Sequence, residues 1–389
     1  MIKIVFFATY ELRKMFYGKT DRQATNGFLF GGMMMRRISV ERLNEDMVLA
    51  RTLFSIDGNI LLNAGIKLKE SYISKFKELG IAEIYIDDKI SSDIVIEDII
   101  KDETRFEARV AVKKAMDGVM NGNNLDVKPI RNVVGKIVEE LMTIQDAMIN
   151  LQDIKSLDSY TFSHSANVCV LSAVTGISMG YDAYNLKELC MGALLHDIGK
   201  TKIPNAILNK VAPLTTEEFN IIKKHSRYGY DILKQSMEVS AYSSYVALTH
   251  HEKYNGEGYP LGLKGKAIHE FSRIVSVADV YDAMTSNRVY RRRINISEVV
   301  EYLVSLGDHH FDYEIVRKMI EHISVFPLGS LIMISTGETA IVVDNNKKYP
   351  NRPVIRLIKD PYGVEYKNFD EIDLTSCNNI TITEVLGDF

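Results

Sequence analysis

The adjacent pair His196-Asp197 is the feature that most constrains the fold of this chain. It ends the apolar run 193–195, which is typical of a buried helix. A carboxylate in apolar surroundings is costly unless a cation compensates its charge. The fold must therefore bring a cation to Asp197, and metal coordination supplies one. Lys200 follows His196 by four residues, so a continued helical turn would place both on one side. Its ammonium would then neutralise a phosphate lying over the metal.

Further histidines and a second aspartate in the same helical region extend this pair into a candidate metal site. Asp279 lies in another apolar helical stretch, where an uncompensated carboxylate would again be costly. Each residue taken singly has a structural explanation. Five histidines and two aspartates together exceed the needs of one tetrahedral zinc site, and they suit two cations that share a bridging carboxylate. The candidates are His164, His196, Asp197, His225, His250, His251 and Asp279.

Length and composition limit the class of protein. A chain of 389 residues suggests two or three folded units. The formal net charge of −4 argues against a field that gathers duplex nucleic acid, although a small anionic ligand needs only a few local cations. Three widely spaced cysteines indicate reduced thiols. Because no apolar run approaches the roughly 20 residues of a membrane helix, we expect a cytoplasmic protein without a membrane span.

The pattern along the chain predicts a mainly α fold with two small appended domains. Helical periodicity dominates from about residue 127 to 324, and short β-rich runs separated by turns follow residue 326. The first residues lack regular patterning and suggest a misassigned start codon. We interpret 1–37 as an unstructured extension, 38–90 as a small α/β accessory domain, 91–126 as a helical connector, 127–325 as the helical core and 326–389 as a small β appendage.

Three motifs in the helical core resemble those of the HD-GYP family, a branch of the HD-domain metal-dependent phosphohydrolases. They are HDIGK at 196–200, HHEKYNGEGYP at 250–260 and DVYDAMT at 279–285, and the second is highly specific. The resemblance covers about half of the chain. It implies an HD-type helical phosphohydrolase core that hydrolyses cyclic di-GMP to linear pGpG or to GMP. The expected nucleophile is a hydroxide activated by two metal ions, with iron or manganese as the expected metals.

The resemblance also implies a role for each candidate ligand, with Asp197 bridging the two metals. Some family members hold a third metal through a glutamate four residues before the first histidine. That position is Tyr160 here, so we expect two metals. The implied sets are His164, His196, Asp197 and Asp279 for one metal, and Asp197, His225, His250 and His251 for the other.

Three basic side chains match family positions that meet the ligand. Lys200 matches the lysine that contacts the scissile phosphate, while Arg288 and Arg291 match positions that meet phosphates or guanines. Asp282 is left outside the metal shell, to orient a ligand or to pair with an arginine. His309-His310 is interpreted as an exposed pair at a helix start.

The GEGYP segment is interpreted as a loop that shapes the pocket. Gly256 and Gly258 permit a tight backbone path, and Pro260 stiffens its exit. Tyr259 either lies at the site, as a substrate-binding residue, or packs as a core aromatic, and both readings stay open. The family also implies contact between this loop and diguanylate cyclases.

Two alternatives to this enzyme remain open. One is a catalytically weak cyclic-dinucleotide sensor or scaffold that keeps the fold. The other is a phosphodiesterase for a related cyclic dinucleotide. The ligand set is intact except at Tyr160, and this favours catalysis.

Overall fold

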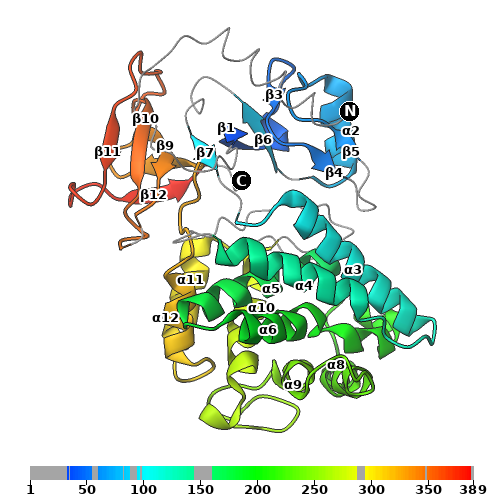
Figure 1. The fold of residues 1–389 in the computed structure, drawn as a ribbon. Helices are drawn as coiled ribbons and strands as arrows, with labels where there is room; N and C mark the ends of the chain where they lie inside the picture. Colours follow the sequence, from blue (N-terminus) through cyan, green and yellow to red (C-terminus); the bar gives the residue numbers. More distant parts are fainter. Residues whose placement is uncertain are drawn as a thin grey trace. The chain divides into compact units, whose positions relative to one another are not determined.

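The computed structural model describes residues 33–34, 36–54, 60–81, 83–87, 94–96, 99–143, 160–286, 294–346 and 348–386. Most of the described residues are helical, and strands lie toward both ends (Figure 1). The helices are α2 (Glu70–Glu78), α3 (Asp102–Met120), α4 (Lys128–Met142), α5 (Tyr160–Ser178), α6 (Ala183–Leu195), α7 (Asn205–Leu208), α8 (Thr216–Lys234), α9 (Ala241–Thr249), α10 (Glu270–Thr285), α11 (Ile296–Ser305) and α12 (Tyr313–Ile320), with short 3-10 turns η1 (Val40–Arg42), η3 (Ile198–Lys202) and η4 (Gly265–Ala267).

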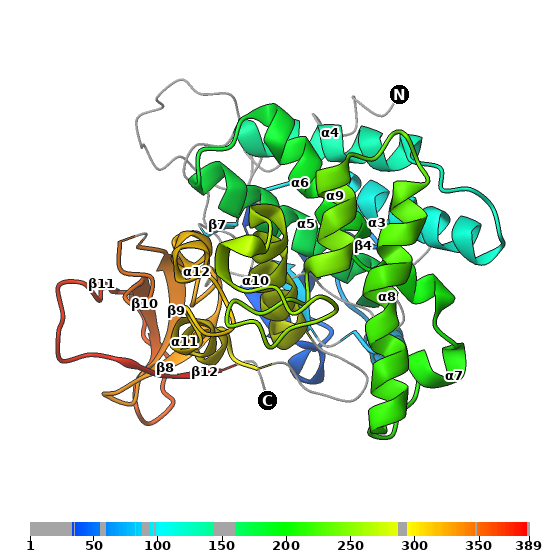
Figure 2. The ribbon, with the colours of Figure 1, turned by 90° about the horizontal axis from the view of Figure 1, so that it is seen from below.

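Helix α5 lies at the centre of the helical core. Almost every side chain from Ser163 to Thr175 is buried, and a helix that is apolar on all sides must be enclosed by others. It packs against α3, α6, α10 and α12. Helices α8 and α9 lie side by side in both ribbon views (Figures 1 and 2). This arrangement brings the ends of several helices to one place.

Helix α3 belongs to the same hydrophobic core. It occupies much of the segment interpreted as a connector, and its face with Ala108, Val112 and Ala115 is buried in the cluster that also contains residues of α4, α5 and α6. Its N-terminal turn is held by Glu140 of α4. The carboxylate there accepts hydrogen bonds from the Lys101 amide (2.8 Å) and the Thr104 hydroxyl (2.7 Å). Helix α3 is therefore fixed to the helices that carry the candidate ligands.

The N-terminal described residues form small antiparallel sheets beside α2. Strand β6 pairs with β2 and β3, β4 pairs with β5, and β1 pairs with β7. Their core includes Leu49, Ile84 and Phe76. Strand β2 already includes residues of the segment interpreted as an extension, while residues 1–32 lie outside the described ranges. The strands are β1 (Met33–Met34), β2 (Arg36–Ser39), β3 (Val48–Leu49), β4 (Leu53–Phe54), β5 (Ile60–Leu62), β6 (Glu83–Asp87) and β7 (Val95–Ile96).

A five-stranded antiparallel sheet follows the helical core, in the order β11-β10-β9-β8-β12. Its core includes Ile332, Val342 and Ile355. The predicted fold class, mainly α with a small mixed N-terminal part and a small β C-terminal part, is confirmed. The strands are β8 (Leu331–Ile334), β9 (Thr339–Asp344), β10 (Val354–Lys359), β11 (Glu371–Asp373) and β12 (Ile382–Val385).

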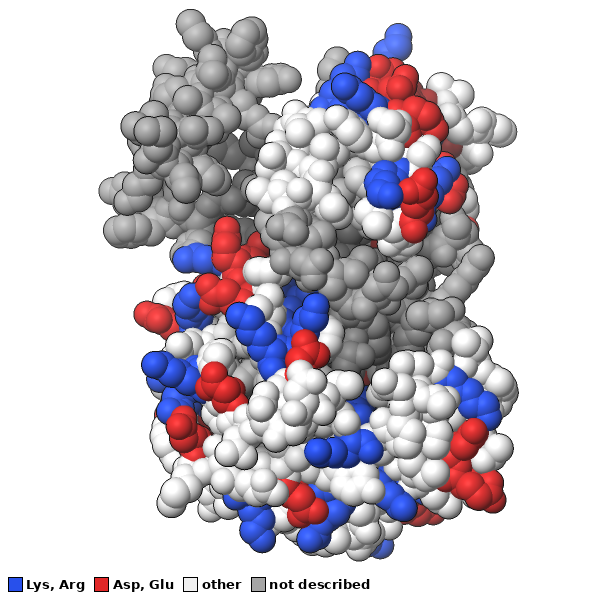
Figure 3. Space-filling view, turned by 90° about the vertical axis from the view of Figure 1, so that its right-hand side faces the viewer, with Lys and Arg blue, Asp and Glu red and all other residues white. Residues whose placement is uncertain are grey.

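The charged side chains on the surface show no large patch of one sign on the described part of the face in Figure 3. Lysines and arginines are interspersed with acidic residues over the described part of the face in Figure 3. Among the described helices, none combines the length and the apolar character needed to cross a membrane.

Candidate metal centre

Five helices deliver the seven predicted ligands to one place. His164 comes from α5, the pair His196-Asp197 from the end of α6, and His225 from α8. The remaining ligands come from the end of α9 and from α10. Candidate donor atoms lie within 4.8 Å of one another in three overlapping groups. These groups are His164, His196 and Asp279; His196, Asp197 and His250; and His225, His250 and His251. We call the seven residues the ligand cluster.

Gly199 allows two of the ligand-bearing elements to meet. It lies in η3, directly after the His196-Asp197 pair, and η3 packs on α8. A Cβ at this position would lie 1.9 Å from the His225 carbonyl oxygen and 2.4 Å from the Gly229 amide nitrogen. Both are backbone atoms that no side-chain rotation can remove. Only glycine therefore lets His225 approach Asp197.

Backbone carbonyls set the tautomers of three histidines. The Nδ1 atom of His196 lies 2.7 Å from the Ala193 oxygen, and that of His225 lies 2.7 Å from the Ile222 oxygen. His250 Nδ1 lies 3.1 Å from the Val246 oxygen. Because a carbonyl only accepts, each Nδ1 carries the proton and each neutral ring presents a lone pair at Nε2. This is the ring orientation that metal-binding histidines commonly adopt.

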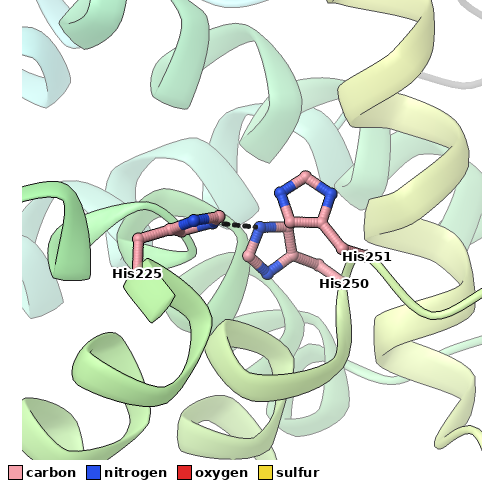
Figure 4. A group of neighbouring side chains, drawn as sticks. All are labelled: His225, His250 and His251. Carbon is pink, nitrogen blue, oxygen red and sulfur yellow. Dashed lines mark hydrogen bonds between the residues drawn. The ribbon is translucent and has the colours of Figure 1, made fainter. Parts of the chain in front are cut away.

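The Nε2 atoms of His225 and His250 face each other and the Asp197 carboxylate. His225 Nε2 lies 3.4 Å from His250 Nε2 (Figure 4). The same atom lies 3.5 Å from Asp197 Oδ1. Burial lowers the pKa of His225, and burial together with neighbouring histidines holds the pKa of His250 well below its usual value. Both rings are therefore neutral near pH 7, and their acceptor atoms face one another.

Two further acceptors in the centre are buried without a hydrogen bond from the described residues. They are His196 Nε2 and Asp197 Oδ1. Buried polar atoms in proteins are nearly always paired, and an unpaired carboxylate oxygen is especially costly. Divalent cations would satisfy all of these acceptors at once. The donor set, imidazole nitrogens with carboxylate oxygens, suits first-row metal ions. The residues present therefore fit a metal centre.

His164 forms the other side of the centre and contacts two carboxylates. Its Nε2 lies 3.0 Å from Asp279 Oδ1, and its Nδ1 lies 2.7 Å from Asp282 Oδ2. Burial alone would lower the pKa of His164, but its hydrogen bonds to the two aspartates outweigh burial and raise the pKa to about 9. The sequence predicts that Asp282 orients a ligand or pairs with an arginine. The structure places its carboxylate against His164.

Asp197 and Lys200 form a close ion pair at the edge of the ligand cluster. The ammonium lies 2.6 Å from Asp197 Oδ2. Burial would raise the pKa of Asp197, but Lys200 and His196 hold it well below its usual range. The carboxylate is thus ionised and available as a ligand. Lys200 remains partly exposed, with 27% of its side chain accessible, so its ammonium also faces the solvent side of the site.

The two ends of the loop at 252–263 are held together by Glu252, a residue to which the sequence pattern assigned no role. Glu252 is buried, and its carboxylate accepts the amides of Leu261 (2.7 Å) and Leu263 (3.1 Å). Gly258 passes so close that an added Cβ would lie 2.2 Å from the Lys253 nitrogen. The position of Glu252 directly after the pair His250-His251 was the only sign in the sequence that this carboxylate has a structural role. The loop is shaped as predicted, by close backbone contact at glycine.

Tyr259 lies beside the ligand cluster. Its ring packs on His251, with ring centroids 4.8 Å apart, and Lys223 lies over it at 5.4 Å. Burial and the nearby carboxylates of Asp197 and Asp279 raise the pKa of Tyr259. A neutral phenol therefore lies beside His251, and the role of Tyr259 in substrate binding stays a prediction.

The His309-His310 pair has a role that sequence reasoning did not foresee. Its carbonyl oxygens accept hydrogen bonds from the backbone amides of Asn255 (2.8 Å) and Tyr254 (2.9 Å), so the turn before α12 supports the loop.

Three other predicted residues have no described side-chain position. Arg288, Arg291 and the side chain of Tyr160 lie outside the described residues.

Comparisons with known proteins agree with this geometry. Residues 150–315 match the HD domain family, and residues 331–387 match a KOW domain associated with the HD domain. The segment 150–315 is an HD domain. The first match contains all three sequence motifs and agrees with their resemblance to HD-domain proteins, and the second match covers strands β8 to β12.

Several relatives of known activity are similar to this chain. A cyclic di-GMP phosphodiesterase of Pseudomonas aeruginosa is 30% identical over 250 residues, which cover 64% of this chain and 60% of that protein. One from Borreliella burgdorferi is 32% identical, covering 59% of this chain and 60% of the relative. A 3'3'-cGAMP-specific phosphodiesterase of Vibrio cholerae is 37% identical, covering 43% and 38%. The chain thus spans no more than about 60% of the length of these relatives.

Proposed function

We propose that this protein hydrolyses cyclic di-GMP with the help of two divalent metal ions held by the ligand cluster. One observation supports this proposal above the others. Imidazole and carboxylate acceptors from five helices converge in the HD domain, and two of them, His196 Nε2 and Asp197 Oδ1, have no hydrogen-bond partner among the described residues. The named activity of the relatives supplies the substrate.

The side chains divide the work in this proposal. When bound, two divalent ions polarise the phosphate and lower the pKa of water enough for attack near neutral pH. Asp197 offers two carboxylate oxygens that face different ligands, which suits a bridging role. Lys200 offsets charge on the phosphate oxygens as it develops. Tyr259 borders the site as a neutral phenol.

The metal count and identity belong to the proposal. His164, His196, Asp197 and Asp279 would hold one ion, and Asp197, His225, His250 and His251 the other. His250 also lies in the group with His196 and Asp197, so it sits between the two sets. Iron or manganese suits the mixed donor set. A third ion is not expected, because Tyr160 replaces the glutamate of other members.

An assay with matched variants tests this function. The purified chain, loaded anaerobically with Fe(II) or Mn(II), is incubated with cyclic di-GMP, and products are separated by chromatography as pGpG or GMP. We expect turnover by the wild type and none by Asp197→Ala. Asp231→Ala, which removes an exposed carboxylate from α8, serves as the control and should retain turnover. A folded, metal-loaded wild type that yields no product would exclude the enzyme and favour a sensor.

A mixed cyclic GMP–AMP dinucleotide is the second candidate substrate. It is supported by the similarity to the 3'3'-cGAMP-specific relative. The same assay with 3'3'-cGAMP as a competing substrate decides between them, because the ratio of kcat/KM values measures specificity directly. We expect the larger value for cyclic di-GMP. Contact between the 252–263 loop and a diguanylate cyclase stays a prediction.

A further inference from the structure

Asp282 is a buried carboxylate that lies behind a metal ligand instead of in the ligand cluster. It is 2% exposed, and its Oδ2 lies 2.7 Å from Nδ1 of His164. The opposite ring atom, Nε2, is the one that points to Asp279 and the metal centre. A carboxylate that accepts the second N–H of a metal-binding imidazole fixes the tautomer and the ring plane. Asp282 therefore orients His164 as a ligand.

A second polar residue holds Asp282 in turn. Asn167, on α5 and fully buried, donates from Nδ2 to Asp282 Oδ1 over 2.7 Å. This bond fixes the orientation of the amide, because only its nitrogen donates. Its oxygen then faces away from Asp282, and Arg105 Nη1 lies 3.5 Å from it. Both oxygens of the carboxylate are thus engaged by side chains of α5.

Arg105 comes from a helix outside the HD domain match. It lies in the first turns of α3, is 6% exposed, and is separated from the matched segment 150–315 by the whole of α4. An arginine buried at such a position brings a permanent positive charge into the core. The guanidinium orients the amide of Asn167, whose oxygen lies 3.5 Å from Arg105 Nη1. Helix α5 packs on both α3 and α10, so the three polar side chains form one buried line across three helices.

We propose that Arg105 and Asn167 are positioning residues for the metal centre, acting through Asp282 on His164. The inference deepens the proposed function, because it rests on His164 being a metal ligand. It also assigns α3 a role in the reaction, since a displacement of α3 would alter the ligand geometry at His164.

Metal affinity of the full chain, measured without substrate, tests this proposal. Mn(II) is titrated into metal-free protein, and the dissociation constant is compared for wild type, Asp282→Asn, Asn167→Ala and Arg105→Gln. Loss of an outer partner of a ligand commonly weakens binding by about 10–100-fold. We expect that range for Asp282→Asn, and about tenfold, its lower end, for the other two. Arg131→Gln, at an exposed arginine of α4, is the matched control and should bind like wild type.

The double variant Arg105→Gln/Asp282→Asn separates positioning from general structural damage. If Arg105 acts through Asp282, its loss in the Asp282→Asn background costs less than twofold, because contacting residues in one network are not additive. Multiplied losses, or wild-type affinity in folded Arg105→Gln and Asn167→Ala, would overturn the proposal. Should Arg105→Gln not fold, Arg105→Lys takes its place. A wild type that binds no Mn(II) or Fe(II) would instead overturn the proposed function itself.

Discussion

At the residue scale, Lys200 can interact with two partners, the Asp197 carboxylate and a substrate phosphate. In the structure its ammonium neutralises Asp197 at 2.6 Å, while part of the side chain is accessible. Metal ions bound to the ligand cluster would take over the compensation of Asp197. The ammonium is then available to a phosphate lying over the metals.

Lys200→Met should therefore lower turnover of cyclic di-GMP without removing the metals. Loss of one group that stabilises developing charge commonly costs about 10²–10³ in kcat. Metal content by elemental analysis should equal that of wild type. Lys202→Met, an exposed lysine of the same 3-10 turn, is the control. A Lys200→Met variant with wild-type kcat, or one without metal, would contradict the role assigned to Lys200.

His164 makes metal binding dependent on pH. Its pKa in the metal-free protein is raised to about 9, so the ring is protonated near pH 7.5, whereas a metal ligand must offer a lone pair. Loading at about pH 7.5 should release a proton from His164, and affinity should rise with pH until about 9. Calorimetry in buffers of different ionisation enthalpy measures this proton. Asp282→Asn should reduce the release, because one of the carboxylates that raise the pKa is lost. Equal heats in all buffers would contradict this account.

At the element scale, the close approach of η3 and α8 decides whether the ligands meet. At their contact, the backbone of Gly199 in η3 lies directly against the backbone of His225 and Gly229 in α8. An ordinary side chain at position 199 would separate them. The spacing of the histidines does not reveal this constraint, because α6 ends at Leu195 and α8 begins only at Thr216, and the motif sets no length for the connection between them.

Gly199→Ala should destabilise the protein and weaken metal binding together. Forcing a methyl group into this contact costs about 1–3 kcal/mol or more, and it moves His225 away from Asp197. Gly135→Ala is the control, because an added Cβ on α4 meets nothing within 4 Å and alanine is the better helix former. Urea unfolding of metal-free protein and Mn(II) titration give the two readouts. Unchanged metal affinity in Gly199→Ala would show that this contact does not position His225.

At the scale of the whole molecule, the ligand cluster ties together helices that are distant in the chain. His164 and Asp279 lie at opposite ends of the HD domain, on α5 and α10. An unfolded chain cannot hold all seven donors around two ions at once. Metal binding is therefore linked to folding, and it stabilises the native state alone.

Addition of Mn(II) should raise the melting temperature of the full chain. A ligand at 100 times its dissociation constant stabilises by about 2.7 kcal/mol, which corresponds to roughly 5–10 °C for a domain of this size. Calorimetric melting with and without EDTA measures the shift. Asp197→Ala should melt at the same temperature in both. An equal shift in wild type and Asp197→Ala would place the stabilising ion outside the ligand cluster.

The sequence by itself determined the helical core, the resemblance to HD domains and the seven candidate ligands. Periodicity reveals which helices are buried, and a carboxylate in an apolar helix reveals that a cation is needed, because both follow from the local cost of burial. Tertiary structure alone decided which residues position the candidate ligands. Glu252, Asn167 and Arg105 acquire their roles through partners between 9 and 115 residues away along the chain. The contact of Gly199 with α8 depends on how η3 and α8 pack. Such contacts leave no periodic trace, since they depend on three-dimensional distance and not on spacing along the sequence.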